Sequence, residues 1–205
     1  MQEVASRHAA SLPAAAPREH VHTRSVVFRG YRREDGLWDI EAELTDAKTY
    51  AFTAPDRGTV EAGQPVHGMA IRLTVDDAMK IRDIAVGMPA APFPECQGAK
   101  PPMSRLIGCT LGSGWRKAIA HALGGTQGCA HLRELLFNMA TAAYQTIPLY
   151  RHHLRRMAGL PEPVIKRPPP HLGQCLAWDF DGPVVARRQP QFAGWRPEKK
   201  DAGGT

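Results

Sequence analysis

The sequence predicts an α+β domain, in which a curved antiparallel sheet is followed by helices packed on one of its faces. Two observations favour this class. Residues 22–87 show strand-like alternation of apolar and polar side chains, interrupted by hairpin signals. Residues 113–158 instead show apolar side chains at helical spacing. Strands that precede helices along the chain are typical of α+β domains.

The length of 205 residues fits one domain with tails better than two domains. We expect a disordered segment over residues 1–20, a single domain over 21–190 and a flexible tail over 191–205. The first segment lacks the continuous apolar stretch of a secretory signal. No run of about 18 apolar residues that could span a membrane occurs, so we expect no membrane partner.

The first two strands are predicted to form a hairpin. Residues 22–32 lead into Glu34-Asp35-Gly36, a strong turn signal. In the next strand one face is apolar and the other acidic, which indicates a core side and a solvent side; the apolar face consists of Trp38, Ile40, Ala42 and Leu44 and the acidic face of Asp39, Glu41 and Glu43. Asp46-Ala47-Lys48 is expected to turn the chain into a short strand over residues 49–53, and residues 55–63 are expected to form a loop.

A strand over residues 65–76 should direct His67 inward, because His67 alternates in phase with Met69, Ile71, Leu73 and Val75. A turn at Asp76-Asp77 precedes a strand over 80–86, and the prolines that follow end the sheet. An inward histidine is more often a hydrogen-bonded core residue than a ligand. His67 gains importance only if its face of the sheet covers the helix that carries His131.

Two helices and a late strand complete the predicted domain. Ser113 is a candidate N-cap for a helix over residues 115–123, which Gly124-Gly125 should end. Thr126 can cap a second helix from about residue 128, which Pro148 should kink or break, with a helical continuation to about residue 156. After a proline-rich connector, residues 175–188 are predicted to form a strand that returns to the sheet.

The second helix carries the most informative pattern of the chain. A polar stripe at 3-4-3-4 spacing runs beside an apolar stripe; the polar stripe consists of His131, Glu134, Asn138, Thr141 and Gln145 and the apolar stripe of Leu132, Leu136, Met139 and Ala143. Such a polar stripe indicates a lined cavity or a buried hydrogen-bond network. In the catalytic interpretation His131 is the general acid or base and Glu134 orients it. Polar substrate atoms would then be bound by Asn138, Thr141 and Gln145, together with Trp115.

Cys129 lies at the start of this helix, where the helix dipole favours a thiolate. On a regular helix Cys129 and His131 diverge by about 200°, so they share a pocket only if the helix start is irregular. Cys129 and His67 are assisting catalytic candidates. A small buried hydrophobic residue is an equally good interpretation of Cys129.

A metal site is the alternative use of the same residues. His67, Cys129, His131 and Glu134 are zinc or iron ligands by type, although their spacing is not diagnostic. The sequence contains no HExxH and no CxxC pair, so neither cofactor is favoured. It also contains no dinucleotide, Walker or serine-hydrolase signature.

Charge and cysteine content restrict the partners. The net charge of +6 is dispersed along the chain, which favours a solvated basic surface over nucleic-acid binding. The four widely spaced cysteines suit reduced thiols in the cytoplasm. We expect a small-molecule substrate or ligand, and Trp195 with the proline-rich connector would allow a homodimer by arm exchange.

Four segments in order along the chain carry a resemblance: residues 35–42 (DGLWDIEA), 67–69 (HGM), 128–132 (GCAHL) and 175–178 (CLAW). With them the chain resembles a bacterial family catalogued as domain of unknown function 2889, over about residues 20–190. The resemblance implies a bacterial cytoplasmic protein with a single domain that includes the Cys175 segment. It implies no reaction, cofactor or catalytic residue.

The leading functional hypothesis is a small cytoplasmic enzyme that acts on a soluble organic molecule, such as an aromatic compound. Its chemistry would be His131–Glu134 proton transfer of the lyase, isomerase or hydrolase type. A metal-binding or accessory protein with Cys and His ligands is the alternative, and a non-catalytic ligand-binding or interaction module is the third.

Overall fold

The computed structural model describes residues 12–161 and 163–196. The chain divides into two compact units, residues 1–147 and 148–205, where the sequence predicts one domain over 21–190. The boundary falls at Pro148, inside the long helix. Most of the predicted N-terminal segment and of the predicted tail lies outside the described residues.

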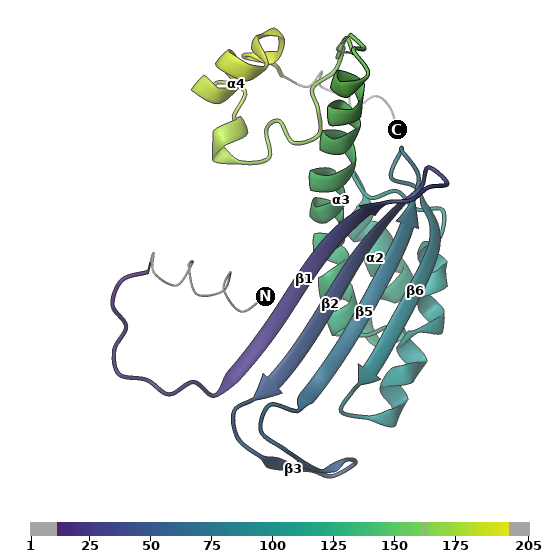
Figure 1. The fold of residues 1–205 in the computed structure, drawn as a ribbon, viewed down its shortest axis with the longest axis vertical. Helices are drawn as coiled ribbons and strands as arrows, with labels where there is room; N and C mark the ends of the chain where they lie inside the picture. Colours follow the sequence, from purple (N-terminus) through teal and green to yellow (C-terminus); the bar gives the residue numbers. More distant parts are fainter. Residues whose placement is uncertain (1–11, 162, 197–205) are drawn as a thin grey trace, which may run out of the picture. The chain divides into compact units, whose positions relative to one another are not determined.

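The first unit is built on a four-stranded antiparallel sheet in the order β1-β2-β5-β6 (Figure 1). These strands are β1 (His22–Arg32), β2 (Trp38–Lys48), β5 (Pro65–Val75) and β6 (Ile81–Ala90). A small hairpin of β3 (Phe52–Ala54) and β4 (Gly58–Val60) connects β2 to β5, so the predicted loop over 55–63 contains a strand. Gly36, at a φ of 83°, makes the predicted turn between β1 and β2. The antiparallel meander predicted from the sequence is therefore confirmed.

The side chains of β2 alternate between a buried and an outer face, as expected. Trp38, Ile40, Ala42 and Leu44 are each at most 1% exposed. On β5, Met69, Ile71, Leu73 and Val75 join them in the core. Alternate residues of a strand point to opposite faces, so one face of the sheet is apolar and the other carries the acidic residues of β2.

The end of β2 differs from the prediction. Residues 46–48 do not turn the chain but continue the strand, since Asp46 pairs with Arg24 of β1 and with His67 of β5. Two long neighbouring strands supply backbone partners up to Lys48, and these outweigh the turn preference of a single Asp. Asp46 therefore falls on the inward face, two residues beyond Leu44.

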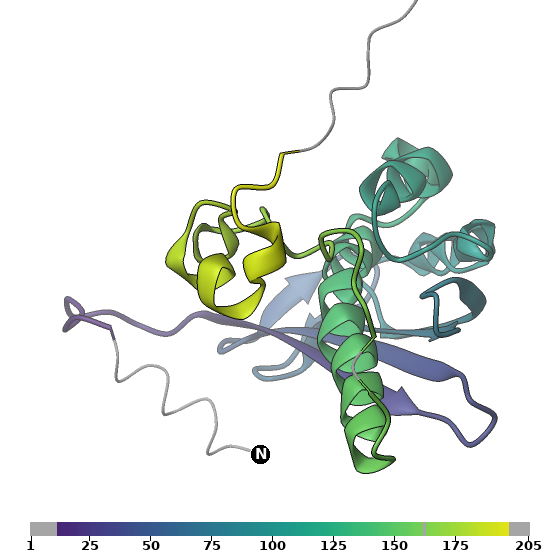
Figure 2. The same ribbon diagram turned by 90° about the horizontal axis from the view of Figure 1, so that it is seen from above.

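One helix and the first half of a second, up to Ile147, cover the apolar face of the sheet (Figures 1 and 2). They are α2 (Trp115–Leu123) and α3 (Ala130–Met157), and the first half of α3 supplies six buried residues to the unit's core: Leu132, Leu135, Leu136, Met139, Ala143 and Ile147. Short 3-10 helices lie between β6 and α3, namely η1 (Pro94–Ala99), η2 (Pro101–Leu106) and η3 (Gly125–Gln127). Among the described residues, no helix combines the length and apolar character needed to cross a membrane.

The predicted helix caps need correction. Gly114, at a φ of 84°, takes the N-cap position of α2 without a side-chain cap, in place of Ser113. Thr126 lies within η3, and α3 begins only at Ala130. Pro148 lies inside α3 and does not break it.

The predicted late strand over residues 175–188 is wrong. In the second unit this segment forms η4 (Leu176–Trp178) and α4 (Pro183–Arg188), followed by η5 (Pro190–Phe192). A proline at the first position of a helix is preset to helical φ, so Pro183 starts α4 despite the two valines that follow. Leu172, Val185 and Phe192 form a small core of this unit.

Candidate metal centre

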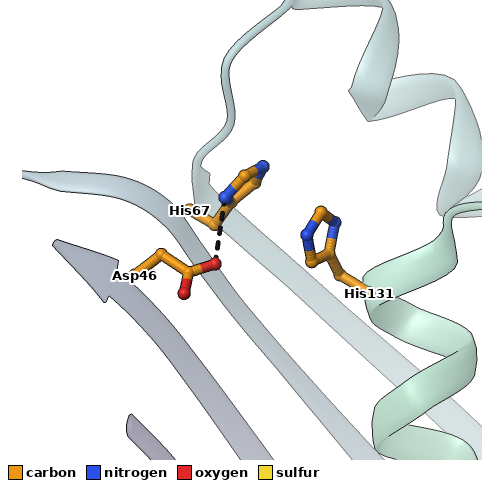
Figure 3. A group of neighbouring side chains, drawn as sticks. All are labelled: Asp46, His67 and His131. Atoms are coloured by element: carbon orange, nitrogen blue, oxygen red, sulfur yellow. Dashed lines mark ion pairs between the residues drawn. The ribbon is translucent and has the colours of Figure 1, made fainter. Parts of the chain in front are cut away.

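The inward face of the sheet and the start of α3 bring together Asp46, His67 and His131 (Figure 3). Asp46 and His67 are register partners on β2 and β5, and His131 is in the first turn of α3. One ligand atom from each residue lies within 4.8 Å of the other two. Strand alternation and helix packing thus bring three side chains of metal-ligating type together at one end of the sheet.

The Asp46 carboxylate is held firmly in its charged form. It is 4% exposed and accepts two hydrogen bonds from Arg24, Nε to Oδ1 at 2.8 Å and Nη2 to Oδ2 at 2.9 Å. The Nε2 atom of His22 lies 3.1 Å from Oδ1. Burial alone would raise the pKa of Asp46, but the hydrogen bonds and charge of Arg24, aided by His67 and His22, lower it.

His67 is close to Asp46 without a well-aligned hydrogen bond to it. Its Nδ1 lies 3.1 Å from Asp46 Oδ2, yet this buried nitrogen has no hydrogen-bond partner of good geometry within the described part of the chain. Burial lowers the pKa of His67, and the neighbouring His131 lowers it further, while Asp46 opposes the shift in part. A neutral imidazole is therefore favoured, which keeps a nitrogen lone pair available.

The two imidazoles face each other. Their ring centroids are 4.1 Å apart and their planes are tilted by 37°, and a ring nitrogen of His131 is directed towards His67 and Asp46 (Figure 3). The sequence condition for a functional His67 was that its sheet face should cover the helix of His131. That condition is met.

Cys129 lies next to His131. Its Sγ lies 3.8 Å from His131 Nδ1. The two side chains approach because Cys129 precedes the first helical residue, so helical spacing does not apply to it. Cys129 also lines an open cavity of about 540 Å³, together with Phe93, Glu95, Cys96, Gly98, Ala99, Thr126, Gln127 and Gly128.

Glu134 does not orient His131 as predicted. Its carboxylate accepts a hydrogen bond from Arg24 Nη1 at 2.9 Å and its side chain is 56% exposed. Arg24 thus joins Glu134 to Asp46, because β1 passes beside the first turns of α3. The predicted ligand set of His67, Cys129, His131 and Glu134 is replaced by one in which Asp46 supplies the carboxylate.

The predicted cavity lined by the polar stripe is also wrong. Asn138, Thr141 and Gln145 are exposed, since α3 packs its apolar stripe on the sheet and turns this part of the polar stripe to solvent, whereas His131 faces His67. Trp115 lies in the core at 3% exposure, and its Nε1 donates a hydrogen bond to the carbonyl oxygen of Leu136 at 2.8 Å.

Asp46 and Arg24 are the residues that sequence reasoning missed. A signal for Asp46 was available, because it continues the period-two series of inward positions after Leu44. A carboxylate on a core face requires a partner. Arg24 occupies the matching inward position of β1, directly opposite Asp46.

Two imidazole nitrogens and one carboxylate oxygen are a donor set for zinc or iron(II). Ligand atoms at about 2.0–2.2 Å from one ion in tetrahedral geometry are about 3.3–3.6 Å apart. The observed upper limit of 4.8 Å is wider by about an ångström or more, so the three side chains would have to move closer together to hold an ion. Three protein ligands would leave coordination positions for water or substrate.

Neither the curated proteins nor the solved structures contain a match to this chain. The model of one protein family, described as protein of unknown function (DUF2889), matches residues 22–145. The match covers more than half of the sequence and includes all four strands of the sheet, Asp46, His67 and the start of α3. The chain therefore belongs to the DUF2889 family.

Proposed function

We propose that this protein is a metal-dependent enzyme that acts on a small, soluble organic molecule. Asp46, His67 and His131 would hold one zinc or iron(II) ion. The observation that carries the proposal is the convergence of their ligand atoms within 4.8 Å. A bound ion of this kind activates water and polarises oxygen atoms of a substrate, which suits proton-transfer chemistry of the lyase, isomerase or hydrolase type.

The electrostatics of the group support a metal centre. Metal ligands must be deprotonated, and the lowered pKa values of Asp46 and His67 favour an ionised carboxylate and a neutral imidazole. The buried Nδ1 of His67 lacks an aligned hydrogen-bond partner among the described residues. Leaving a buried polar atom unsatisfied costs about 1–3 kcal/mol, a cost that coordination of an ion would remove.

Arg24 and His22 would act as supporting groups of this centre. Partners that hydrogen-bond a ligating carboxylate fix its orientation. Arg24 donates one hydrogen bond to each carboxylate oxygen of Asp46. Each carboxylate oxygen has two lone pairs. The bonds from Arg24 therefore leave Oδ2 with one lone pair for an ion.

Metal-free proton transfer at the same residues is the second candidate. It is favoured by the 3.1 Å approach of Asp46 to His67, since a carboxylate beside an imidazole fixes its tautomer. It ranks second because Glu134, the expected partner of His131, pairs with Arg24. The metal content of the purified protein separates the two candidates.

The decisive experiment is metal analysis by mass spectrometry of protein purified without a metal-affinity tag, before and after loading with zinc or cobalt(II). We expect one ion per chain in the wild type. His67→Ala and the more conservative His67→Gln should bind the ion at least about tenfold more weakly, because mutation of an outer-shell partner alone costs about 10–100-fold in affinity. His121→Ala, at an exposed position of α2, is the matched control.

Two results would contradict the metal proposal. One is a wild type that takes up no ion under loading, and the other is His67→Gln protein that binds the ion as tightly as His121→Ala does. Circular dichroism of each variant checks that the fold is kept. Metal binding without turnover in a substrate screen would instead favour the accessory-protein alternative.

We further propose that the protein works in the bacterial cytoplasm, on its own or as a homodimer. The four cysteines are free in the structure, which is compatible with a reducing compartment. Native mass spectrometry measures the oligomeric state together with the metal.

A further inference from the structure

We propose that the open cavity beside Cys129 is the substrate pocket and that it takes a small carboxylate with a compact apolar body. This inference rests on the proposed metal centre. The cavity has a volume of about 540 Å³, within the range of about 300–1,000 Å³ that is typical of small-molecule sites. It is formed by η1 on one side and by η3 with the start of α3 on the other.

The cavity is adjacent to the proposed centre through one residue. Cys129 lines the cavity, and its Sγ is 3.8 Å from the Nδ1 atom of His131. The ring of His131 in turn lies against the ring of His67. Asp46, His67 and His131 do not line the cavity themselves, so the side chain of Cys129 separates a molecule in the cavity from the ligand group.

The wall formed by residues 125–128 is backed by positive charge. Arg133 donates hydrogen bonds to the carbonyl oxygens of Leu123 and Gly125 at 2.8 and 3.1 Å. Arg105 donates to the carbonyl oxygen of Ala122 at 3.1 Å and to the side-chain oxygen of Gln127 at 3.3 Å. Neither arginine lines the cavity, so their charges act on it from behind this wall. Two positive charges behind the wall favour an anionic group at it.

The opposite wall is apolar. Phe93, Cys96 and Ala99 line it, and Phe93 is 52% exposed. An exposed aromatic ring at a cavity offers a flat surface for an apolar or aromatic body. The only charged residue in the lining is Glu95. Its carboxylate repels an anion, so removing this charge tests whether the ligand is negatively charged.

The experiment uses cobalt(II)-loaded protein with benzoate as the probe and benzamide as its uncharged counterpart. Visible absorption reports on the metal, and ligand-observed NMR reports on binding. We expect benzoate to bind and to shift the cobalt spectrum, and benzamide to bind at least about tenfold more weakly. Glu95→Gln should tighten benzoate binding about twofold to fivefold, the size of an exposed charge interaction.

A cavity-filling variant tests the location. A side chain at Gly98 would meet no heavy atom within 4 Å of its Cβ, so Gly98→Leu can fill the pocket without displacing its walls. It should weaken benzoate binding by about tenfold or more. Gly87→Leu, on the outer face of β6, is the matched control and should bind as the wild type does.

The outcomes are distinguishable. Protein that takes up no cobalt overturns the proposed metal centre and this inference with it. Cobalt-loaded protein overturns this inference alone if benzoate leaves the spectrum unchanged, if benzamide binds equally well, or if Gly98→Leu has no effect.

Discussion

Replacing Asp46 by asparagine tests whether the carboxylate organises the centre. Asparagine keeps the shape but removes the charge, and its amide nitrogen must face one of the donors of Arg24. At least one charge-assisted hydrogen bond is lost, worth about 1.5–3 kcal/mol. Arg24 is 37% exposed and water can replace part of the interaction, so we expect the free energy of unfolding to fall by about 1.5–2 kcal/mol.

Urea denaturation followed by circular dichroism measures this change. In thermal unfolding this change corresponds to a decrease of about 3–8 °C in the midpoint temperature, at about 2–4 °C per kcal/mol for a chain of this size. Glu43→Gln is the control, because it removes a more exposed pair with Arg29 at 3.0 Å, and exposed ion pairs contribute little to stability. If Asp46→Asn unfolds at the same urea concentration as Glu43→Gln, the reasoning is refuted.

The same pair of proteins gives a pH signature. The pKa of Asp46 is lowered on folding, so its contribution to stability is present above the unfolded value of about 3.9 and is lost as the pH falls through the folded value. The stability difference between wild type and Asp46→Asn should therefore be constant near neutral pH and shrink in acid. A difference that grows on acidification would contradict the assignment.

Three further predictions concern the neighbouring residues. Cys129→Ser should retain the metal stoichiometry, because Cys129 contacts His131 Nδ1 and lies outside the ligand group; a cobalt–thiolate absorption band in the wild type would show instead that it is a ligand. Because the pKa of His67 is lowered, metal binding should persist somewhat below pH 6.5, the usual histidine value, before protons compete; loss of metal well above that pH, in a titration of metal content, would refute this. Trp115→Phe should reduce the free energy of unfolding by about 1–3 kcal/mol, since it removes the buried hydrogen bond from Nε1 to the carbonyl oxygen of Leu136 and leaves part of the indole's space in the core empty; weaker benzoate binding with unchanged stability would show that Trp115 acts at the site.

Local sequence patterns were sufficient to predict most secondary-structure elements of the first unit. The period-two alternation of Trp38, Ile40 and Ala42 predicts a strand with one buried face, and that face is the core of the sheet. The helix over 115–123 was predicted with its observed ends, because a glycine pair marks its C-terminus. The β1–β2 turn followed from Gly36, whose positive φ suits glycine.

The candidate centre was predicted only in part. His67 and His131 were identified separately, from strand phase and from helix spacing. Their 4.1 Å approach depends on how α3 crosses the sheet, which no local pattern specifies. The local preference of Asp46 predicts a turn, but the pairing of this segment with β1 and β5 keeps it in the strand.

The sequence by itself determined which strand residues alternate between the buried and the exposed face, where the elements of the first unit lie and which side chains can act as ligands or catalytic groups. These properties depend on neighbours within a few positions. Only the tertiary structure decided which carboxylate meets the histidines. Asp46 and Glu134 are both candidates by residue type. Glu134 accepts a hydrogen bond from Arg24 on β1, whereas the strand register places Asp46 beside His67. Such choices depend on contacts between residues distant in the chain, and these form only when the helix packs on the sheet.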